Sequence, residues 1–250
     1  MESHLTVLAL ALMPALGNFA GGLLAEIVPA TPRLLSGALH LAAGIILAVV
    51  AVELMPEALA GAPPWIVLLG LCLGGGFYIL LESVIDRLQP RGGGAEGGAE
   101  GSMAGAWLIY AAVSFDLFSD GLMIGAGSSV SLELALVLAL GQVMADVPEG
   151  FATIANFKNG GQPRRRRLML AAGFVVPCLI GAAGTYVLLR DLSDTMKYAA
   201  LAFTVGILLL AAIEEMMKEA HESADDTHLS SALFIGGFAL FTFVATFFDR

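Results

Sequence analysis

Two short stretches of this sequence place acidic side chains in pairs inside long apolar runs. The stretch VSFDLFSDGLMIG contains Asp116 and Asp120, and the stretch VMADVPEGFATIA contains Asp146 and Glu149. The i, i+4 and i, i+3 spacings put each pair on one face of a helix. Carboxylate oxygens are the ligands that hard divalent metal ions prefer. The two pairs therefore predict a cation site, with Asp120 and Glu149, each directly before a glycine, as its central ligands and Asp116 and Asp146 completing the shell.

The cost of burying four acids makes a bound cation the favoured interpretation. A charged acid at the centre of a bilayer costs roughly 2.5–3.5 kcal/mol, so that four cost on the order of 10 kcal/mol. Neither acidic run contains an arginine, lysine or histidine that could neutralise them. Protonated acids that bond to neighbouring helices remain the alternative. Pro148 favours a polar lining, because it leaves the carbonyl of Met144 without its helical donor.

The composition explains why these acids must be buried. Of the 250 residues, 58% are hydrophobic and only 14% are charged, and the mean hydropathy is +0.84. Soluble domains average about 25% charged residues, so the chain is expected to be an integral membrane protein. Cys72 and Cys178 both fall in apolar runs, which argues against a disulfide framework or a thiolate zinc site. The single basic cluster, at residues 164–167, lies between two apolar runs, so no nucleic-acid partner is expected.

Apolar runs of about 20 residues or more predict an all-α fold of eight transmembrane helices in a single domain, residues 1–250. The expected spans are Leu5–Val28, Leu35–Ala60, Pro64–Ile85, Met103–Gly127, Ser131–Phe157, Leu168–Leu189, Met196–Met217 and Leu229–Phe248. A glycine-rich inner loop, residues 86–102, separates the first three spans from the last five. Cytoplasmic loops are enriched in lysine and arginine. With both termini outside, nine of the 12 basic residues fall on the inner side, so this orientation is predicted.

Other polar residues of the apolar runs could join the site or its approaches. Glu53 and Glu57 lie toward the outer end of the second span, and Glu214 and Glu215 lie in the inner part of the seventh. Asn18 and His40 are expected to be polar groups in helix packing. His221 and His228 bracket an acidic loop, for which a weak regulatory metal site and a solvated loop are both open. The roles of these residues depend on which helices become neighbours.

The acidic stretches resemble a known pair of motifs. DVPEG at residues 146–150, and its degenerate form DLFSDG at residues 116–121, resemble the two HNxPEG motifs in spans four and five of the ZIP family of divalent-metal transporters. The stretches AAGIILAVVAVELMPEAL in span two and GILLLAAIEEMM in span seven extend the resemblance over most of the chain. The resemblance implies a helical bundle with a binuclear metal site between spans four and five. It also implies passage of zinc, iron, manganese or cadmium toward the cytoplasm.

The resemblance assigns the motif positions residue by residue. In the first motif the histidine, asparagine, proline and glutamate positions are held by Asp116, Leu117, Ser119 and Asp120. In the second motif the histidine and asparagine positions are held by Ala145 and Asp146, whereas Pro148, Glu149 and Gly150 match outright. The acidic position of span seven corresponds to Glu215. That of span six falls near Cys178, so this ligand is expected to be absent or exchanged for a thiol. All motif histidines are replaced, which puts a zinc preference and a full binuclear site in doubt.

The sequence thus predicts a divalent-cation transporter that is not an enzyme and needs no resident cofactor. Its expected metal ligands are Asp116, Asp120, Asp146, Glu149 and Glu215. The expected partners are divalent metal ions and membrane lipid, with a homodimer left open, and the expected location is the bacterial inner membrane. A transport-inactive metal sensor or structural protein remains an alternative. An intramembrane aspartyl protease is disfavoured, because its YD and GxGD signatures are absent.

Overall fold

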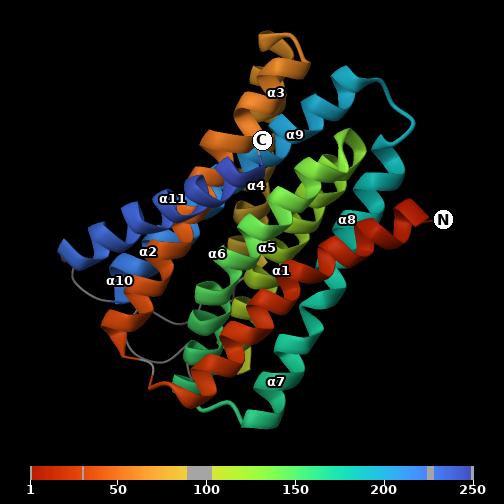
Figure 1. The fold of residues 1–250 in the computed structure, drawn as a ribbon. Helices are drawn as coiled ribbons and strands as arrows, with labels where there is room; N and C mark the ends of the chain where they lie inside the picture. Colours follow the sequence, from red (N-terminus) through yellow and green to blue (C-terminus); the bar gives the residue numbers. More distant parts are fainter. Residues whose placement is uncertain (1, 30, 89–102, 224–227, 249–250) are drawn as a thin grey trace.

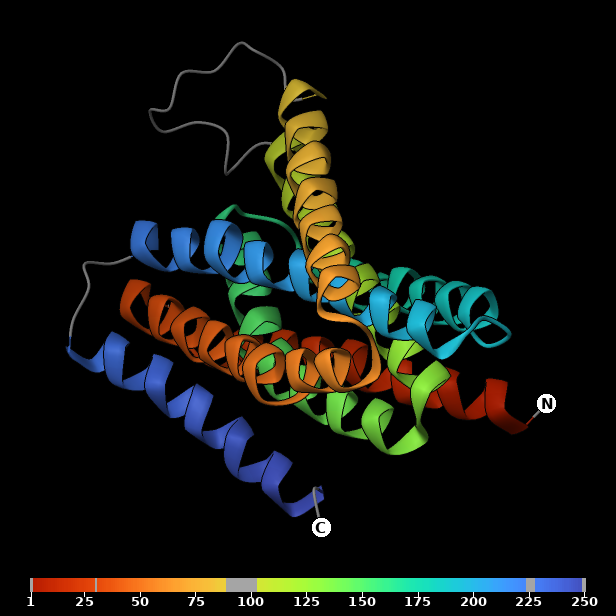
Figure 2. The same ribbon diagram turned by 90° about the horizontal axis from the view of Figure 1, so that it is seen from above.

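The computed structural model describes residues 2–29, 31–88, 103–223 and 228–248, and within these ranges it contains helices and no strands. The predicted all-α class is confirmed. Figure 1 shows the helices as one bundle, which Figure 2 shows from above. The elements are α1 (Glu2–Ile27), α2 (Pro32–Ala48), η1 (Val49–Leu54), α3 (Met55–Gly61), α4 (Pro64–Leu88), α5 (Met103–Val130), α6 (Leu132–Asn159), α7 (Arg164–Gly173), α8 (Val175–Leu189), α9 (Asp194–Leu210), η2 (Ala211–Met217), α10 (Lys218–Ser223) and α11 (His228–Phe248). Most of the predicted inner loop, residues 89–102, lies outside the described residues.

Seven helices of the described residues are long and apolar enough to cross a membrane. They are His4–Ile27, Pro32–Gly61, Pro64–Val84, Leu132–Asn159, Arg164–Leu189, Asp194–Glu222 and His228–Phe247. These helices are compatible with an integral membrane protein. The helix α5, which carries Asp116 and Asp120, is not one of the seven. Seven of the eight predicted spans thus correspond to helices of sufficient length and apolarity, and the full set of eight spans stays a prediction.

Prolines accompany two of the places where the long helices change geometry. Pro177 has no backbone N–H for the carbonyl of Gly173, and the helix is interrupted there, between α7 and α8. In the second span, the π-helical segment η1 lies immediately before Pro56, where an α-helical bond is again missing. A second π-helical segment, η2, interrupts the span formed by α9 and α10. Such π segments are frequent at functional sites. By contrast, α6 continues as one helix through Pro148.

Glycines allow the site-bearing helices to touch their neighbours backbone to backbone. A β-carbon added to Gly21 of α1 would lie 1.9 Å from the carbonyl oxygen of Val147 on α6. A β-carbon added to Gly121 of α5 would lie 2.2 Å from the carbonyl oxygen of Cys178 on α8. No other residue type fits at these positions without a shift of the helices. The helix pairs α1–α6 and α5–α8 are thereby fixed at close distance.

Close backbone contact at glycine also joins the remaining long helices in two further pairs. A β-carbon added to Gly44 of α2 would lie 2.0 Å from the carbonyl oxygen of Phe234 on α11, and one added to Gly74 of α4 would lie 1.9 Å from that of Phe203 on α9. In both pairs the partner helix also contributes a glycine to the contact. Close approach at small residues is the usual basis of helix association in membranes.

The four pairs reveal an internal repeat. Helix α1 pairs with α6 and α8 pairs with α5, whereas α2 pairs with α11 and α9 pairs with α4. If the helices of residues 2–88 are exchanged with those of residues 164–248, and α5 with α6, the same four pairs result. The pair α1–α6 becomes α8–α5, and the pair α2–α11 becomes α9–α4. Both α2 and α9 also run into a π-helical segment. The two outer thirds of the chain are therefore built alike.

The repeat is inverted, as the order of the glycine contacts shows. Along α1 and α6, Gly17 faces Val143 and Gly21 faces Val147, so the two helices run in the same direction. On α5, Gly121 faces Cys178 and Gly125 faces Ala182 of α8, so α5 and α8 also run in the same direction. Only Ser131 separates α5 from α6, and these two packed helices are antiparallel. Helix α8 therefore runs opposite to α1, and the second repeat is upside down relative to the first.

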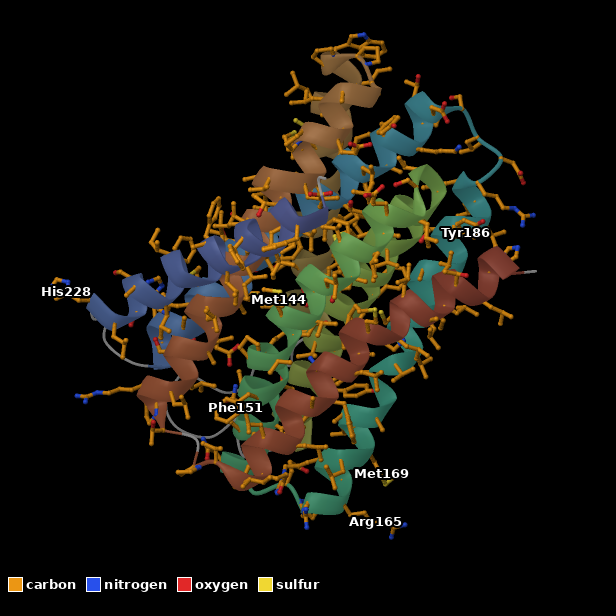
Figure 3. All side chains as sticks on the ribbon, in the orientation of Figure 1. Met144, Phe151, Arg165, Met169, Tyr186 and His228 are labelled. Atoms are coloured by element: carbon orange, nitrogen blue, oxygen red, sulfur yellow. The ribbon has the colours of Figure 1, made fainter. Side chains whose placement is uncertain are left out.

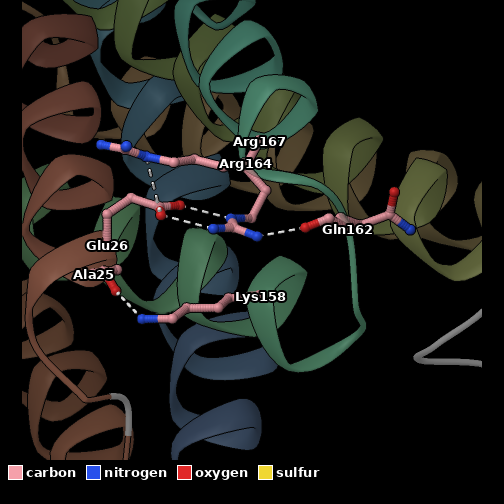
Figure 4. Close-up of polar contacts among 6 residues, drawn as sticks. All are labelled: Ala25, Glu26, Lys158, Gln162, Arg164 and Arg167. Atoms are coloured by element: carbon pink, nitrogen blue, oxygen red, sulfur yellow. Dashed lines mark hydrogen bonds and ion pairs between the residues drawn. The ribbon is translucent and has the colours of Figure 1, made fainter.

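A buried ion pair closes one end of the bundle (Figure 4). Arg167 donates from Nε and Nη2 to the two carboxylate oxygens of Glu26, at 2.6 Å each, and from Nη1 to the carbonyl oxygen of Gln162. Beside them, Lys158 of α6 donates to the carbonyl oxygen of Ala25 at 2.9 Å. This carbonyl belongs to the last turn of α1, where carbonyls lack helical donors and attract cations. The ends of α1, α6 and α7 are held together by these contacts.

Breaking this ion pair should destabilise the protein strongly. The side chains of Arg167 and Glu26 are only 10% and 7% exposed, so Arg167→Met would leave a nearly buried carboxylate with the more distant Arg164 at 3.6 Å. A lost partner in a buried pair costs about 3–5 kcal/mol. Thermal unfolding in detergent should therefore show a lower midpoint for Arg167→Met and no change for the exposed Arg165→Met. The double variant Glu26→Leu, Arg167→Met should recover most of the loss; equal midpoints for all variants would contradict this role.

Candidate metal site

The four acids of the two motifs lie together between α5 and α6. Asp116, Asp120, Asp146 and Glu149 are exposed by only 3%, 0%, 1% and 7%. One oxygen each of Asp116, Asp120 and Asp146 lie within 4.8 Å of one another. Two oxygens that bind one ion at 2.0–2.6 Å can be at most about 5 Å apart. The three aspartates are therefore close enough together to form a candidate site for one divalent ion.

Glu149 lies at the edge of this group. Its carboxylate is beside that of Asp116, across the interface of α5 and α6. The sequence interpretation named Asp120 and Glu149 as the central ligands, whereas the closest group joins Asp120 to Asp116 and Asp146. The structure thus brings all four predicted residues together. Which of them bind an ion stays a prediction.

The acids have few partners of their own. Both oxygens of Asp116 and Asp146, one oxygen of Asp120 and one of Glu149 have no hydrogen-bond partner among the described residues. In the same part of the chain, no lysine, arginine or histidine forms an ion pair with them. Buried charges are ordinarily paired or coordinate metals. The carboxyl groups lie against one another instead, Asp116 beside Glu149 and Asp120 beside Asp146, an arrangement that suits a shared cation as well as shared protons.

Gln142 is a member of the site that the sequence interpretation missed. It is fully buried on α6, one turn before Asp146, and its Nε2 donates to Oδ1 of Asp120 on α5. This bond links the two helices and orients the carboxylate of Asp120. The signal was available in the sequence, because a glutamine four residues before Asp146 lies on the same helix face. The sequence did not indicate that its partner on α5 is Asp120.

The backbone beside the acids is also polar. Pro148 lies within α6 and cannot donate to the carbonyl oxygen of Met144, which is left for another donor or for a cation. Figure 3 labels Met144 and Phe151, which bracket this segment of α6 near the middle of the bundle. Backbone carbonyls without helical partners occur in membrane proteins where they line a polar cavity. The segment therefore offers carbonyl as well as carboxylate oxygen.

Close contact with a neighbouring helix requires the glycine that follows each pair of acids. A β-carbon added to Gly150 would lie 2.0 Å from the carbonyl oxygen of Asn18 on α1, just as Gly121 abuts Cys178 on α8. The acids are thus held at the points where α6 meets α1 and where α5 meets α8. Close backbone contact at these points fixes the position of each acidic helix.

Adding a methyl group at Gly150 should loosen this arrangement. Gly150→Ala forces α1 and α6 apart, and overpacking of this kind costs about 1–3 kcal/mol. The matched control is Gly184→Ala on α8, where an added β-carbon meets nothing within 4 Å. The thermal midpoint should fall for Gly150→Ala and stay equal or rise for Gly184→Ala. Equal midpoints would contradict the close contact.

The remaining polar residues singled out from the sequence are not members of the closest group. Glu215 is half-buried in η2, and Glu53 lies in η1. Cys178 is buried on α8, and its thiol donates to the carbonyl oxygen of Ala11 on α1 at 3.0 Å. The thiol is thus engaged as a neutral donor, and the suggestion that it replaces an acidic ligand gains no support from this contact.

His40 and His221 belong to a separate contact. Nδ1 of His40 lies 2.8 Å from the carbonyl oxygen of Ser36, within its own helix, and its ring packs edge-on against His221, with ring centroids 5.4 Å apart. The acidic segment between His221 and His228, for which a regulatory metal site was left open, falls on residues 224–227, which lie outside the described residues.

No protein-family model matches the chain, and no curated protein matches it either.

Proposed function

We propose that this protein is a transporter that carries divalent metal ions across a membrane toward the cytoplasm. The observation that carries the proposal is the group of four buried carboxylates on α5 and α6, three of which offer oxygens within 4.8 Å of one another. No basic side chain of the described residues neutralises them. A divalent cation would do so, and the ion is then the substrate.

The inverted repeat supports transport over a static metal site. Many secondary transporters consist of two inverted repeats, with the substrate bound between them near the middle of the bilayer. Here the four acids lie on α5 and α6, the two helices that the repeat exchanges with each other. Each repeat also contains one π-helical segment that carries acidic residues, Glu53 in η1 and Glu214 and Glu215 in η2. These segments would border the path on opposite sides of the site.

The finer assignments follow from the sequence. We propose that the chain is an atypical member of the ZIP family, with eight spans that include α5, both termini outside, and a place in the bacterial inner membrane. Its substrates would be zinc, iron, manganese or cadmium. Glu215 would join Asp116, Asp120, Asp146 and Glu149 along the ion path.

Transport by purified protein tests this proposal directly. Lipid vesicles that contain the protein and a trapped metal-sensitive dye should take up Mn²⁺ or Zn²⁺ faster than empty vesicles. A transport-inactive metal sensor would bind the ion without flux into the vesicles. Absence of both binding and flux for all four metals would contradict the proposal.

The proposed orientation predicts which loops are reachable from outside the cell. The α6–α7 loop is followed by four arginines, residues 164–167, and should be cytoplasmic. Gly161 has φ 73°, so a cysteine is better introduced at the exposed Asn159. In intact cells, Asn159→Cys should resist an impermeant thiol reagent, whereas Asp191→Cys in the α8–α9 loop should react. The reverse pattern would invert the topology and the direction of transport.

A further inference from the structure

The amide of Asn18 is buried on α1 without any hydrogen bond. Its exposed fraction is 0%, and neither Oδ1 nor Nδ2 has a partner in the described ranges. Several other buried polar side chains are satisfied within their own helix; Thr153, for example, donates to the carbonyl oxygen of Glu149 at 3.0 Å. A polar group that served helix packing would bond to a neighbouring helix. Since leaving a buried amide unpaired is costly, a different role is needed for Asn18.

Asn18 lies at the depth of the acids on α6. A β-carbon added to the preceding residue, Gly17, would lie 3.5 Å from Cβ of Asp146. The backbone of Asn18 itself touches Gly150, the residue after Glu149. The two helices are parallel, so Asn18 is level with the segment that carries both acids.

The side chain of Asn18 lies on a fully buried face of α1. Ala11, Ala15 and Asn18 follow the i, i+4, i+7 spacing of one helix face, and all three have exposed fractions of 0%. The carbonyl of Ala11 on this face accepts the thiol of Cys178 from α8. The backbone of Cys178 in turn abuts Gly121, the residue after Asp120. Helix α1 therefore packs against α8 and α5 as well as against α6, and α5 and α6 carry the acids.

We propose that the amide oxygen of Asn18 is an additional ligand of the cation held by Asp116, Asp120 and Asp146. This inference rests on the proposed function and specifies its substrate class. Four carboxylates already exceed the charge of a divalent ion, and an amide adds an oxygen ligand without adding charge. Six oxygen ligands in octahedral geometry suit Mn²⁺ and similar hard ions, whereas Zn²⁺ is satisfied by four ligands. Asn18 thus favours six-coordinate hard cations over zinc.

Binding of Mn²⁺ and Zn²⁺ to the purified full-length protein in detergent tests the ligand role without transport. Asn18→Ala should weaken Mn²⁺ binding by about tenfold or more, comparable to other losses around metal sites, and Zn²⁺ binding by clearly less. Asn18→Asp is nearly isosteric, keeps the oxygen and should bind Mn²⁺ within about threefold of the natural protein. Val7→Ala removes buried volume from α1 three turns away and should change neither affinity.

Unfolding without metal separates a ligand from a packing residue. Because Asn18→Ala removes an unpaired amide, its metal-free thermal midpoint should equal or exceed that of the natural protein. A lower midpoint would mean that Asn18 serves packing and would overturn the inference, as would unchanged Mn²⁺ affinity in Asn18→Ala or equal losses in Asn18→Ala and Asn18→Asp. The site itself is tested separately, since Asp146→Asn should abolish binding whatever the role of Asn18.

Discussion

Replacing Asp146 by asparagine is expected to abolish metal uptake and to weaken Mn²⁺ binding by at least about 100-fold. Changes next to metal ligands already cost 10–100-fold, and Asp146 is the α6 member of the closest group of three carboxylates. Asparagine preserves the shape of the side chain but removes its charge. Equilibrium binding to purified protein and flux into vesicles should both report the loss.

The control for this prediction is on the same helix. Glu133 lies in the first turn of α6 and is exposed, so Glu133→Gln makes the same chemical change without touching the site. It should bind and transport like the natural protein. The double variant Asp120→Ala, Glu149→Ala should lose uptake as Asp146→Asn does. Normal uptake in that double variant would contradict the whole site.

Stability should change in the opposite direction to binding. Asp146 is 1% exposed and both of its oxygens lack partners in the described structure. Since a charged acid at mid-bilayer costs roughly 2.5–3.5 kcal/mol, Asp146→Asn should raise the metal-free thermal midpoint. The natural protein should gain more stability than the variant when Mn²⁺ is added, because only the natural protein binds it. A variant that unfolds earlier without metal would show that Asp146 has a structural role.

The acid cluster could be predicted because its determinants are local. Helical spacing places Asp116 with Asp120 and Asp146 with Glu149 on common faces, and the one-residue link between α5 and α6 makes the two helices neighbours. The span limits follow from apolar length, and helix ends differ from the expected ones by a few residues, as in α1, which begins at Glu2 and ends at Ile27. These two inferences, the acid cluster and the span limits, need no knowledge of contacts between distant segments.

The rest of the site depends on contacts between distant segments. The bond from Gln142 to Asp120 and the position of Asn18 beside Gly150 require that α6 pack against both α5 and α1. A single sequence contains the glycines that permit such contacts but not the list of partners. The π-helical segments escaped prediction for a similar reason. Pro56 signals a missing hydrogen bond, whereas the π geometry of η1 depends on how the neighbouring helices accommodate it.

The second large effect is expected in metal selectivity. Mn²⁺ and Fe²⁺ should compete well against Zn²⁺, because the site consists of three aspartates and a glutamate, with no histidine on α5 or α6. Carboxylate and carbonyl oxygens suit manganese and other hard ions, whereas imidazole and thiolate suit zinc. The carbonyl of Met144 and the amide of Gln142 add oxygens of the same kind. Excess Mn²⁺ should therefore suppress Zn²⁺ flux into vesicles.

Two arguments oppose this prediction, and the structure bears on one of them. Zinc also accepts carboxylates at about 2.0–2.2 Å, and the general affinity order places it above manganese and ferrous iron. A soft ligand near the site would strengthen zinc further. Cys178 is the nearest thiol to consider, and it donates its proton to the carbonyl of Ala11. It therefore remains a neutral thiol in this arrangement and supplies no thiolate.

Restoring a histidine should reverse the preference. The Asp116 carboxylate contacts that of Glu149, another acid of the cluster, so Asp116→His replaces a hard oxygen ligand by imidazole within the site. The concentration of Mn²⁺ needed to halve Zn²⁺ flux should rise by about tenfold or more, which corresponds to about 1.4 kcal/mol of relative affinity. The control Ser119→His alters the neighbouring motif position, whose hydroxyl donates to the carbonyl oxygen of Phe115, and should not produce this shift. If Asp116→His transports both metals with the natural preference, Asp116 is not a ligand, and the hard-site interpretation then depends on Asp120 and Asp146 alone.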